Sequence, residues 1–369
     1  MAIANTNLRK AKAAKNDEFY TQLNDVANEL KHYRHHFKGK TVFCNCDDPT
    51  WSAFWKYFHL NFEVLGLKKL ISTHYDATKP TYKMEYTGGD DNDIEVGVKT
   101  PLEGNGDFRN VECIELLKES DIVVTNPPFS QFREYVAQLI EYDKEFLIIG
   151  NPNAVTYKEI FPLIKNNQMW IGAKPWSHEM YFGVPKEQEE YLVKNKKEGS
   201  AYVIRDGEIL GRAATLWFTN LDIEKRHEKL ILWKKYTLEE FPKYDNYMAW
   251  NVNKVADIFV DEDIEVTVDN EELEQITKAY GSDAAVIETD DDKTRVKIHH
   301  PVMGVPITFL DKYNPDQFTI LGSQRWCKDK IILDAYCGSK SSGDMDFRTI
   351  INGKETYDRI FIRKNSVDR

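Results

Sequence analysis

Four consecutive residues, Asn126-Pro127-Pro128-Phe129, are suited to holding an amino group attached to a flat ring. The Asn126 side-chain carbonyl can accept a hydrogen bond from an N–H₂ group. Pro127 removes a backbone donor and disfavours helical dihedrals at Asn126, so the chain continues extended, with carbonyls along its exit. The Pro127 carbonyl is then a second acceptor, and Phe129 can stack on a heterocycle, a contact worth roughly 1–3 kcal/mol for a base. The motif therefore predicts a pocket for the exocyclic amine of adenine or cytosine, or for an amide.

The elements around this motif predict a parallel sheet. From Lys40 to about Trp170, strand-like and helix-like segments alternate, which is typical of βαβ units whose sheet carries helices on both faces. The predicted strands cover residues 40–46, 68–75, 121–125 and 144–150, and the predicted helices cover residues 49–66, 110–120, 129–142 and 156–167. Ligands of such sheets bind beyond the carboxyl ends of the strands, which is where the motif lies.

Beyond residue 175 the pattern changes to short strand-like segments. The sequence Arg-Asp-Gly-Glu at residues 205–208 predicts a hairpin turn. Residues 236–369 are mixed and punctuated by glycine, without internal repeats or heptads. We therefore predict a first domain over residues 1–235 and a second over residues 236–369.

The net charge of −11 is concentrated in one segment. Residues 257–296 hold 14 Asp and Glu against 3 Lys and Arg, which leaves 46 of each sign from the totals of 60 and 49. A body of balanced charge can present a local basic groove, so a nucleic-acid partner is not excluded. The segment contains helix-like residues 270–281 and strand-like residues 294–300, which favours a folded segment over a tail.

The cysteines and the apolar residues exclude several classes of protein. Five cysteines at irregular spacing, Cys44, Cys46, Cys113, Cys327 and Cys337, do not form a disulfide framework and are typical of a reducing cytoplasm. No paired cysteine motif indicates zinc, so we expect no metal. No stretch approaches 18 apolar residues, and the N-terminus lacks the apolar core of a secretory signal. We therefore expect a cytoplasmic protein that does not contact a membrane.

Asn-Pro-Pro-Phe after such a strand resembles the signature of amino-methyltransferases, and the similarity extends along the chain. Residues 15–22, 43–49, 104–135, 241–254 and 302–318 all resemble the EcoRI-type adenine-specific DNA methyltransferases. The resemblance covers most of the chain and leaves the acidic segment, about 258–300, outside it as an insertion. It implies an α/β fold of the class I S-adenosylmethionine-dependent methyltransferases. Such a fold has a Rossmann-like, mainly parallel sheet with helices on both faces, here followed by a mixed α+β target-recognition region over residues 236–369.

The resemblance also implies S-adenosyl-L-methionine as the methyl donor. No Gly-x-Gly-x-x-Gly follows the first strand, but this donor has no pyrophosphate to bind. Asn45, Asp47 and Asp48 follow that strand and precede a helix. Either carboxylate could hold the donor's ammonium group, and either could instead cap the helix.

Further donor contacts are implied along the chain. Asp107 and Phe108 resemble the family's adenine-binding element, and Asp76 is the positional candidate for the ribose hydroxyls. Tyr20 and Thr21, within an N-terminal segment at 15–30, resemble the residues that close over the methionine moiety. The alternatives are a turn aspartate at each acidic position and ordinary core packing of the aromatic rings. Asn126 is expected to contact the donor as well as the target.

The implied reaction is methyl transfer to N6 of adenine in double-stranded DNA. By accepting both amino hydrogens, Asn126 and the Pro127 carbonyl would favour the more tetrahedral nitrogen of the transition state. The target base must be flipped out of the stack at a cost of a few kcal/mol. Phe129 would cover one face of the base. Trp217 or Phe218 is predicted for the other face, unless these two are core aromatics of a strand.

Three other interpretations stay open. The same pocket chemistry would serve an RNA adenine methyltransferase or a protein glutamine methyltransferase, and a catalytically silent DNA-binding protein is the alternative of another class. Residues 172–180 and 323–330 mix cations with rings, as DNA grooves do, and residues 9–15 are basic. The acidic segment is interpreted as a solvated elaboration, a phosphate-mimicking inhibitor or a partner-binding arm. By resemblance we expect a monomer, bacterial or phage-encoded, that serves restriction–modification with a cognate endonuclease or protects DNA without one.

Overall fold

The computed structural model describes residues 20–89, 93, 96–177, 179–290, 292–324 and 348–366, and the side chain of Tyr20 is not described. The predicted basic segment at 9–15 and most of residues 323–330 lie outside the described residues. The chain divides into two units, Met1–Ile223 and Glu224–Arg369. This division precedes the domain boundary predicted near residue 235.

Unit 1 is built on an eight-stranded sheet of order β5-β4-β3-β2-β6-β7-β12-β8. Its strands are β2 (Thr41–Cys44), β3 (Lys69–Thr73), β4 (Tyr82–Tyr86), β5 (Val98–Pro101), β6 (Ile122–Thr125), β7 (Glu145–Gly150), β8 (Trp170–Ile171) and β12 (Leu216–Thr219). Strands β4 and β12 run antiparallel to the others. The prediction of an α/β protein with a large, mostly parallel central sheet is confirmed.

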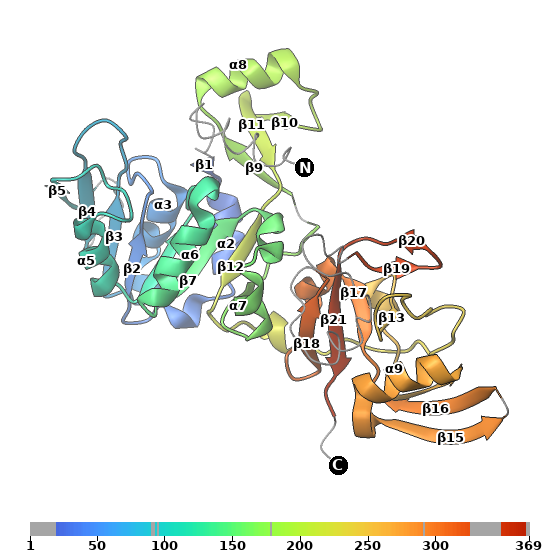
Figure 1. Ribbon diagram of the computed structural model, residues 1–369. Helices are drawn as coiled ribbons and strands as arrows, with labels where there is room; N and C mark the ends of the chain where they lie inside the picture. The colour runs from blue at the N-terminus through green and yellow to red at the C-terminus, as the bar shows by residue number, and fades with distance from the viewer. Residues whose placement is uncertain are drawn as a thin grey trace. The chain divides into compact units, whose positions relative to one another are not determined.

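Helices cover both faces of this sheet, with α5 (Val111–Glu119) and α6 (Phe132–Glu141) in front and α2 (Leu23–Leu30) and α3 (Ala53–Leu60) behind in Figure 1. The short helices are α4 (Phe62–Leu65) and α7 (Phe161–Lys165). Alternate strand residues face opposite layers, because successive side chains of a strand point to opposite faces. On β12, Trp217 packs edge-to-face on Phe54 of α3, and its neighbour Phe218 packs on Phe132 of α6.

A smaller sheet of order β1-β9-β11-β10 extends unit 1. It contains β1 (Tyr20–Thr21), β9 (Met180–Gly183), β10 (Tyr202–Arg205) and β11 (Glu208–Ala213), and α8 (Lys186–Asn195) packs on β11. The predicted hairpin is confirmed, with Asp206 and Gly207 at φ of 52° and 85° between β10 and β11. Strand β1 pairs with β9, so this sheet holds the segment that precedes α2.

Unit 2 contains three sheets, of orders β13-β17-β21-β18, β14-β16-β15 and β19-β20. Their strands are β13 (Trp250–Asn251), β14 (Asp263–Val268), β15 (Ala284–Asp290), β16 (Lys293–His299), β17 (Met303–Pro306), β18 (Phe318–Ser323), β19 (Ile350–Ile351), β20 (Lys354–Glu355) and β21 (Arg359–Lys364). The one α-helix among its described residues is α9 (Asn270–Tyr280).

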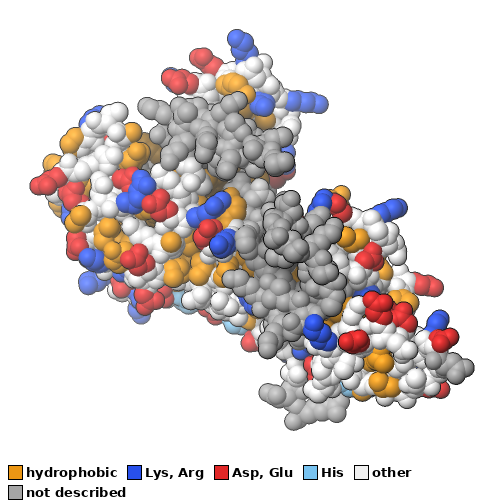
Figure 2. All heavy atoms as spheres, viewed as in Figure 1, with side chains coloured by type: hydrophobic (Ala, Val, Ile, Leu, Met, Phe, Trp, Pro, Cys, Tyr) orange, Lys and Arg blue, Asp and Glu red, His pale blue; other side chains and the backbone are white. Residues whose placement is uncertain are grey.

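The acidic segment is folded, as predicted, into β14, α9, β15 and β16. The negative charge of its carboxylates is partly neutralised within the sheet, because Arg295 lies 3.7 Å from Glu265 and 3.6 Å from Glu288. The buried Tyr280 hydroxyl donates to the Met248 carbonyl at 2.9 Å and accepts from the Val302 N–H at 3.0 Å. Acidic side chains nevertheless gather over α9 on the face drawn in Figure 2.

No helix in the described part of the chain is long and apolar enough to cross a membrane.

Candidate active site

The carboxyl ends of β2, β3 and β6 meet at one edge of the large sheet, because β2 pairs in parallel with both other strands. Hydrogen bonds join their loops. The Thr125 hydroxyl donates to the Asn45 carbonyl at 2.5 Å, and the Asp47 N–H donates to the Thr73 carbonyl at 3.0 Å. The predicted donor loop and the predicted target loop are therefore held together at this edge.

The donor loop after β2 is shaped by side chains rather than by glycine. Cys46 adopts a φ of 59°, in the left-handed region that glycine favours. The Thr73 hydroxyl donates to Asn45 Oδ1 at 2.9 Å, and the Cys46 N–H points to Thr73 Oγ1 at 3.4 Å. Thr73 of β3 thus holds a conformation that a glycine-rich loop would adopt unaided.

Asp47 is a buried carboxylate, 7% exposed, at the start of this loop. Its Oδ2 accepts from the Ser52 hydroxyl, and no described residue donates a hydrogen bond to its Oδ1. Ser52 also caps α3, since its oxygen accepts from the N–H groups of Phe54 and Trp55 at 3.1 and 3.0 Å. Burial raises the pKa of Asp47 to about 7, against the effect of the Ser52 hydrogen bond. Ser52, and neither aspartate, is therefore the helix cap.

Asp48 is already engaged by neighbouring groups. Its Oδ1 accepts from the Thr50 N–H at 2.9 Å, the Thr50 hydroxyl at 2.8 Å and the Tyr82 hydroxyl at 2.8 Å. Its Oδ2 lies 3.4 Å from His74 Nε2. Of the two aspartates, Asp47 thus retains the more available oxygen for a ligand.

Gly106 brings Asp107 and Phe108 to the end of β3. Its φ is 76°, and a Cβ there would lie 2.0 Å from the His74 carbonyl oxygen, so only glycine allows this approach. Both Asp107 oxygens accept from Arg109, Oδ1 from Nε at 2.7 Å and Oδ2 from Nη2 at 2.5 Å. These bonds hold the pKa of Asp107 below its usual range. Phe108 is 2% exposed and packs edge-to-face on Tyr135 at 5.0 Å between ring centroids.

Asp76 and Thr21, two further residues predicted to contact the donor, lie in different environments. Asp76 follows β3 in a turn, where its Oδ1 accepts from the N–H and the hydroxyl of Thr78 at 2.9 and 2.8 Å. The Thr78 N–H is the main cause of the lowered pKa of Asp76. Thr21 Oγ1 is buried in β1 and has no hydrogen-bond partner among the described residues.

The target loop leaves β6 as the prolines predict. Asn126 is half-buried and Pro127 is buried, and the Pro127 carbonyl receives no hydrogen bond from any described residue. The Pro128 carbonyl accepts from the Gln131 N–H at 2.9 Å, which starts the 3₁₀ turn Phe129–Gln131 that leads into α6. The half-buried Phe129 packs against the core beneath α2 and α3.

The prediction that Trp217 or Phe218 stacks on a target base is wrong. Both side chains are 0% exposed, and they point into the two opposite layers of the sheet. Strand β12 pairs along both edges with β7 and β8, and its two faces are covered by Phe54 of α3 and Phe132 of α6. A base could reach either ring only by displacing the core.

Sequence reasoning missed four residues that shape the site: Ser52, His74, Tyr82 and Arg109. His74 lies near the end of the predicted strand 68–75, one residue after the observed end of β3, and could have been found by its position. Tyr82 lies in β4, between the predicted strand at 68–75 and the predicted helix at 110–120 and outside both.

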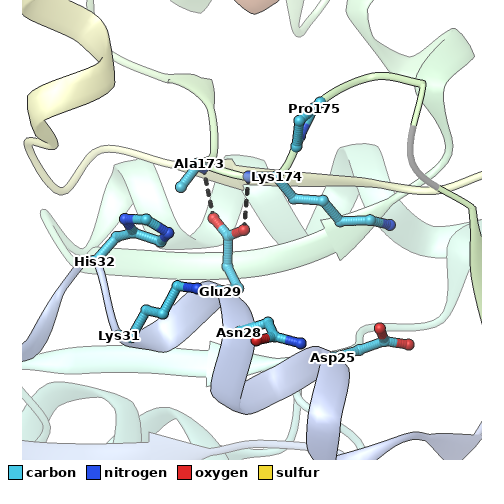
Figure 3. Close-up of a pocket in the computed structure, with 8 residues that line it drawn as sticks. All are labelled: Asp25, Asn28, Glu29, Lys31, His32, Ala173, Lys174 and Pro175. Carbon is cyan, nitrogen blue, oxygen red and sulfur yellow. Dashed lines mark hydrogen bonds between the residues drawn. The ribbon is translucent and has the colours of Figure 1, made fainter.

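A separate pocket lies between α2 and the residues after β8. It is lined by Asp25, Asn28, Glu29, Lys31, His32, Ala173, Lys174 and Pro175 (Figure 3). Glu29 is 1% exposed and accepts from the N–H groups of Ala173 and Lys174 at 2.6 and 2.8 Å, and from the Tyr33 hydroxyl at 2.7 Å. Burial lowers the pKa of Lys174 to about 8. Its lining includes residues of the predicted segments 15–30 and 172–180 but none of the residues singled out for the donor or the target, and Glu29 anchors α2 there.

In the described part of the chain, no three or more His, Cys, Asp or Glu residues gather as metal ligands. Cys44, Cys46 and Cys113 are free thiols.

Comparison with known proteins identifies the family. A family model described as adenine-specific methyltransferase EcoRI matches residues 7–276 and 285–365. The chain belongs to this family. The type II methyltransferase M.EcoRI of Escherichia coli is 40% identical over 380 residues, covering 99% of this chain and 98% of that protein. M.MpnI of Mycoplasma pneumoniae is 35% identical, covering 96% and 97%, and M.MgeORF184P of Mycoplasma genitalium is 33% identical, covering 98% and 99%.

Family membership confirms the predicted enzyme class, an adenine-specific DNA methyltransferase, and corrects one prediction. The acidic segment at 258–300 does not lie outside the family, because the match omits only residues 277–284 within it. Its acidic composition hid a family element that is folded here as β14, α9, β15 and β16. No solved structure matches the chain at a significant level.

Proposed function

We propose that this adenine-specific DNA methyltransferase transfers the methyl group of S-adenosyl-L-methionine to N6 of an adenine flipped out of double-stranded DNA. One observation carries the proposal: the buried carboxylate of Asp47 and the acceptors of Asn126 and Pro127 follow the paired strands β2 and β6. A buried carboxylate suits a cationic donor, and two adjacent carbonyls suit an amino group. On this basis we propose that the sheet belongs to the class I methyltransferase fold.

The residues at the end of β2 fit a donor that carries an ammonium and a sulfonium. Asp47 is buried next to Asp48, so burial and the charge of Asp48 both disfavour the ionised form of Asp47 unless a cation joins them. The Asp47 Oδ1 receives no hydrogen bond from the described residues, so an ammonium could donate to it. Thr21 Oγ1 offers another buried polar atom without a partner among those residues. We therefore assign the ammonium to Asp47.

The remaining donor assignments follow the edge of the sheet. Asp76, after β3, is assigned to the ribose hydroxyls, and Asp107 with Phe108 to the adenine. Asn45 and Asp48 complete the loop around the donor, and Tyr20 and Thr21 are assigned to its methionine end. Phe108 is buried in this structure, so its contact with the donor adenine requires the ring edge or a small movement of Arg109, whose guanidinium lies 5.1 Å from the ring centroid.

At the target loop, Asn126 and the Pro127 carbonyl accept the two hydrogens of the adenine amino group. N6 is a weak nucleophile because its lone pair is delocalised into the ring, and accepting both hydrogens favours a tetrahedral nitrogen. When bound, the donor supplies an electrophilic methyl group on its sulfonium. The loop positions N6 in line with that group, and positioning supplies much of the remaining acceleration. Phe129 stacks on the flipped base and offsets part of the cost of flipping.

All residues assigned to the donor and the target lie in unit 1, so we assign catalysis to unit 1 and recognition of the DNA sequence to unit 2. The three relatives named above come from bacteria, which supports a bacterial or phage-encoded enzyme acting in the cytoplasm. We further propose a monomer, with a restriction endonuclease as its cognate partner where one is encoded.

The test uses methyl-labelled donor with a mixture of double-stranded DNA, total RNA and protein extract. Label in DNA alone, recovered as N6-methyladenine, is the expected result. Label in RNA or in protein glutamine would retain the chemistry of the pocket and overturn the substrate. Donor binding without any labelling would identify a silent binding protein.

A further inference from the structure

Arg109 forms a fork between Asp107, in the loop before α5, and α6, the helix that follows the target loop. Its Nε and Nη2 donate to the two oxygens of Asp107 at 2.7 and 2.5 Å, and its Nη1 lies 3.3 Å from Glu134 Oε2 on α6. A guanidinium holds a carboxylate in a defined plane when both oxygens are bound in this way. Arg109 therefore fixes the orientation of the Asp107 carboxylate, not only its charge.

Helix α6 holds the same loop at a second point one turn later. Gln138 Nε2 donates to the Phe108 carbonyl at 3.1 Å, and the Tyr135 ring packs on the Phe108 ring. Glu134 and Gln138 are four residues apart and lie on one face of the helix. The chain from Asp107 to Arg109 is thus held against α6 through backbone, ring and ion pair.

We propose that Arg109 is a positioning residue for the donor's adenine: it aligns the Asp107 carboxylate so that a free lone pair of that group accepts a hydrogen bond from the adenine amine. The inference rests on the proposed donor. Each carboxylate oxygen has two lone pairs. Arg109 occupies both on Oδ1, through its backbone N–H at 3.0 Å and its Nε at 2.7 Å, and one on Oδ2, so the second lone pair of Oδ2 remains open to a ligand. Because Arg109 keeps Asp107 ionised, the carboxylate acts only as an acceptor.

This arrangement predicts discrimination at one atom of the donor. An adenine presents an N–H₂ donor at its six position, whereas a hypoxanthine presents a carbonyl acceptor that would face the carboxylate. An unpaired polar group in a buried site lowers affinity strongly. The wild-type protein should therefore bind S-adenosyl-L-homocysteine at least roughly 10-fold more tightly than S-inosyl-L-homocysteine. This factor corresponds to the free energy of one hydrogen bond to a charged group.

The experiment measures the dissociation constants of both compounds by calorimetry for the wild type, Arg109→Ala, Arg109→Lys and Gln138→Ala. Arg109→Ala should reduce the preference for the adenosyl compound to about 3-fold or less, the direction expected for a lost bidentate pair. Arg109→Lys should not restore the preference, because an ammonium is a point charge without a fork. Gln138→Ala should weaken binding of the adenosyl compound with Arg109 in place, and it provides a test if Arg109→Ala does not fold.

The matched control is Arg133→Ala. Arg133 lies in the first turn of α6, is 56% exposed and pairs with Glu159 at 3.8 Å, away from the donor loop. The Arg133→Ala variant should have the same dissociation constants for both compounds as the wild type. In turnover, Arg109→Lys should raise KM for the donor while kcat at saturating donor stays near the wild-type value, which a purely structural role would not produce.

A preference unchanged in Arg109→Ala, or restored by Arg109→Lys, would overturn the inference. Absence of binding of both compounds to the wild type would overturn it together with the proposed donor. A preference lost as expected in a protein that labels no DNA would support Arg109 and reject the proposed substrate.

Discussion

Asp47 is the residue whose ionisation most directly links the fold to the donor. Burial raises its pKa to about 7 in the folded protein, whereas an unfolded aspartate titrates near about 3.9. Between about pH 4 and 7 the folded state binds a proton that the unfolded chain has released. The free energy of unfolding without donor should therefore fall as the pH rises through this window.

The variant Asp47→Asn tests this dependence. It removes the titrating group, so it should flatten the decline in unfolding free energy between about pH 4 and 7 and raise that free energy above pH 7. Urea unfolding at pH 5, 6, 7 and 8 measures both effects. An unchanged slope would mean that another group titrates in this window.

Donor binding should show the complementary dependence. An ammonium favours the ionised form of Asp47, so donor affinity should rise with pH through about 7 and binding should release a proton. Calorimetry in buffers of different ionisation enthalpy counts that proton. In Asp47→Asn, affinity should be lower and nearly independent of pH, whereas a persistent dependence would assign the ammonium elsewhere.

The sequence predicted both aspartates of this loop but left open which binds and which caps. Which aspartate keeps an available oxygen depends on three hydrogen-bond donors. Ser52 bonds to Asp47, whereas Thr50 and Tyr82 bond to Asp48. Hydrogen bonds of this kind require the folded chain, and no spacing rule assigns them. The motif Asn126-Pro127-Pro128-Phe129 was recognisable because prolines impose their geometry locally.

At the scale of elements, β12 explains why an aromatic prediction failed. The apolar residues at the start of Leu216–Thr219 are typical of any buried strand, and the sequence does not indicate that β12 inserts antiparallel between β7 and β8. That insertion pairs both edges of β12 and places its two faces under α3 and α6. The predicted parallel strands were found because each apolar run lies in a local βαβ pattern.

Trp217→Ala should act through the core. Removing a fully buried indole leaves a cavity between β12 and α3, which should lower the free energy of unfolding by roughly 3–5 kcal/mol. Chemical denaturation measures the loss. Flipping of the target base, measured by 2-aminopurine fluorescence under folding conditions, should stay near the wild-type level. A loss of flipping without a loss of stability would instead indicate that Trp217 stacks on the target base.

Gly106→Ala should disturb the loop that carries Asp107 more than it disturbs the rest of the fold. A methyl group there would meet the His74 carbonyl, and the residue would be strained at a φ of 76°. We expect donor affinity to fall at least roughly 10-fold, since the loop that carries Asp107 must move away from β3. Gly199→Ala is the control, because it has a φ of 78° but no neighbour within 4 Å of its Cβ position. Equal donor affinities in the two variants would contradict a role for this close approach.

At the scale of the whole molecule, the acidic segment is part of a folded unit and not an added tail. The Tyr280 hydroxyl, which bonds to Met248 and Val302, and the ion pair between Asp283 and Arg363 connect it to the rest of unit 2, so deleting it would disrupt unit 2. Composition alone could not indicate this, because net charge reports on partners and solubility and not on the fold.

The charges can be tested without deletion by the triple variant Glu262→Gln, Glu271→Gln and Glu274→Gln. All three side chains are exposed, so a solvated role predicts methylation rates within about 2-fold of the wild type at both low and physiological salt. A phosphate-mimicking inhibitor would instead give a faster variant, with the largest gain at low salt. The measurement is the initial rate on DNA across a salt series.

The central claim, that Asn126 directs methyl transfer to adenine N6, is tested most directly by single-turnover methylation of DNA, with the product identified by mass spectrometry. The comparison is between the wild type, Asn126→Ala and the control Asn61→Ala, a half-buried asparagine at the C-terminus of α3. We predict N6-methyladenine from the wild type and from Asn61→Ala. For Asn126→Ala we predict a rate at least roughly 100-fold lower, with donor and DNA binding retained. Transfer by Asn126→Ala near the wild-type rate, or methyl recovered on another atom, would contradict the account.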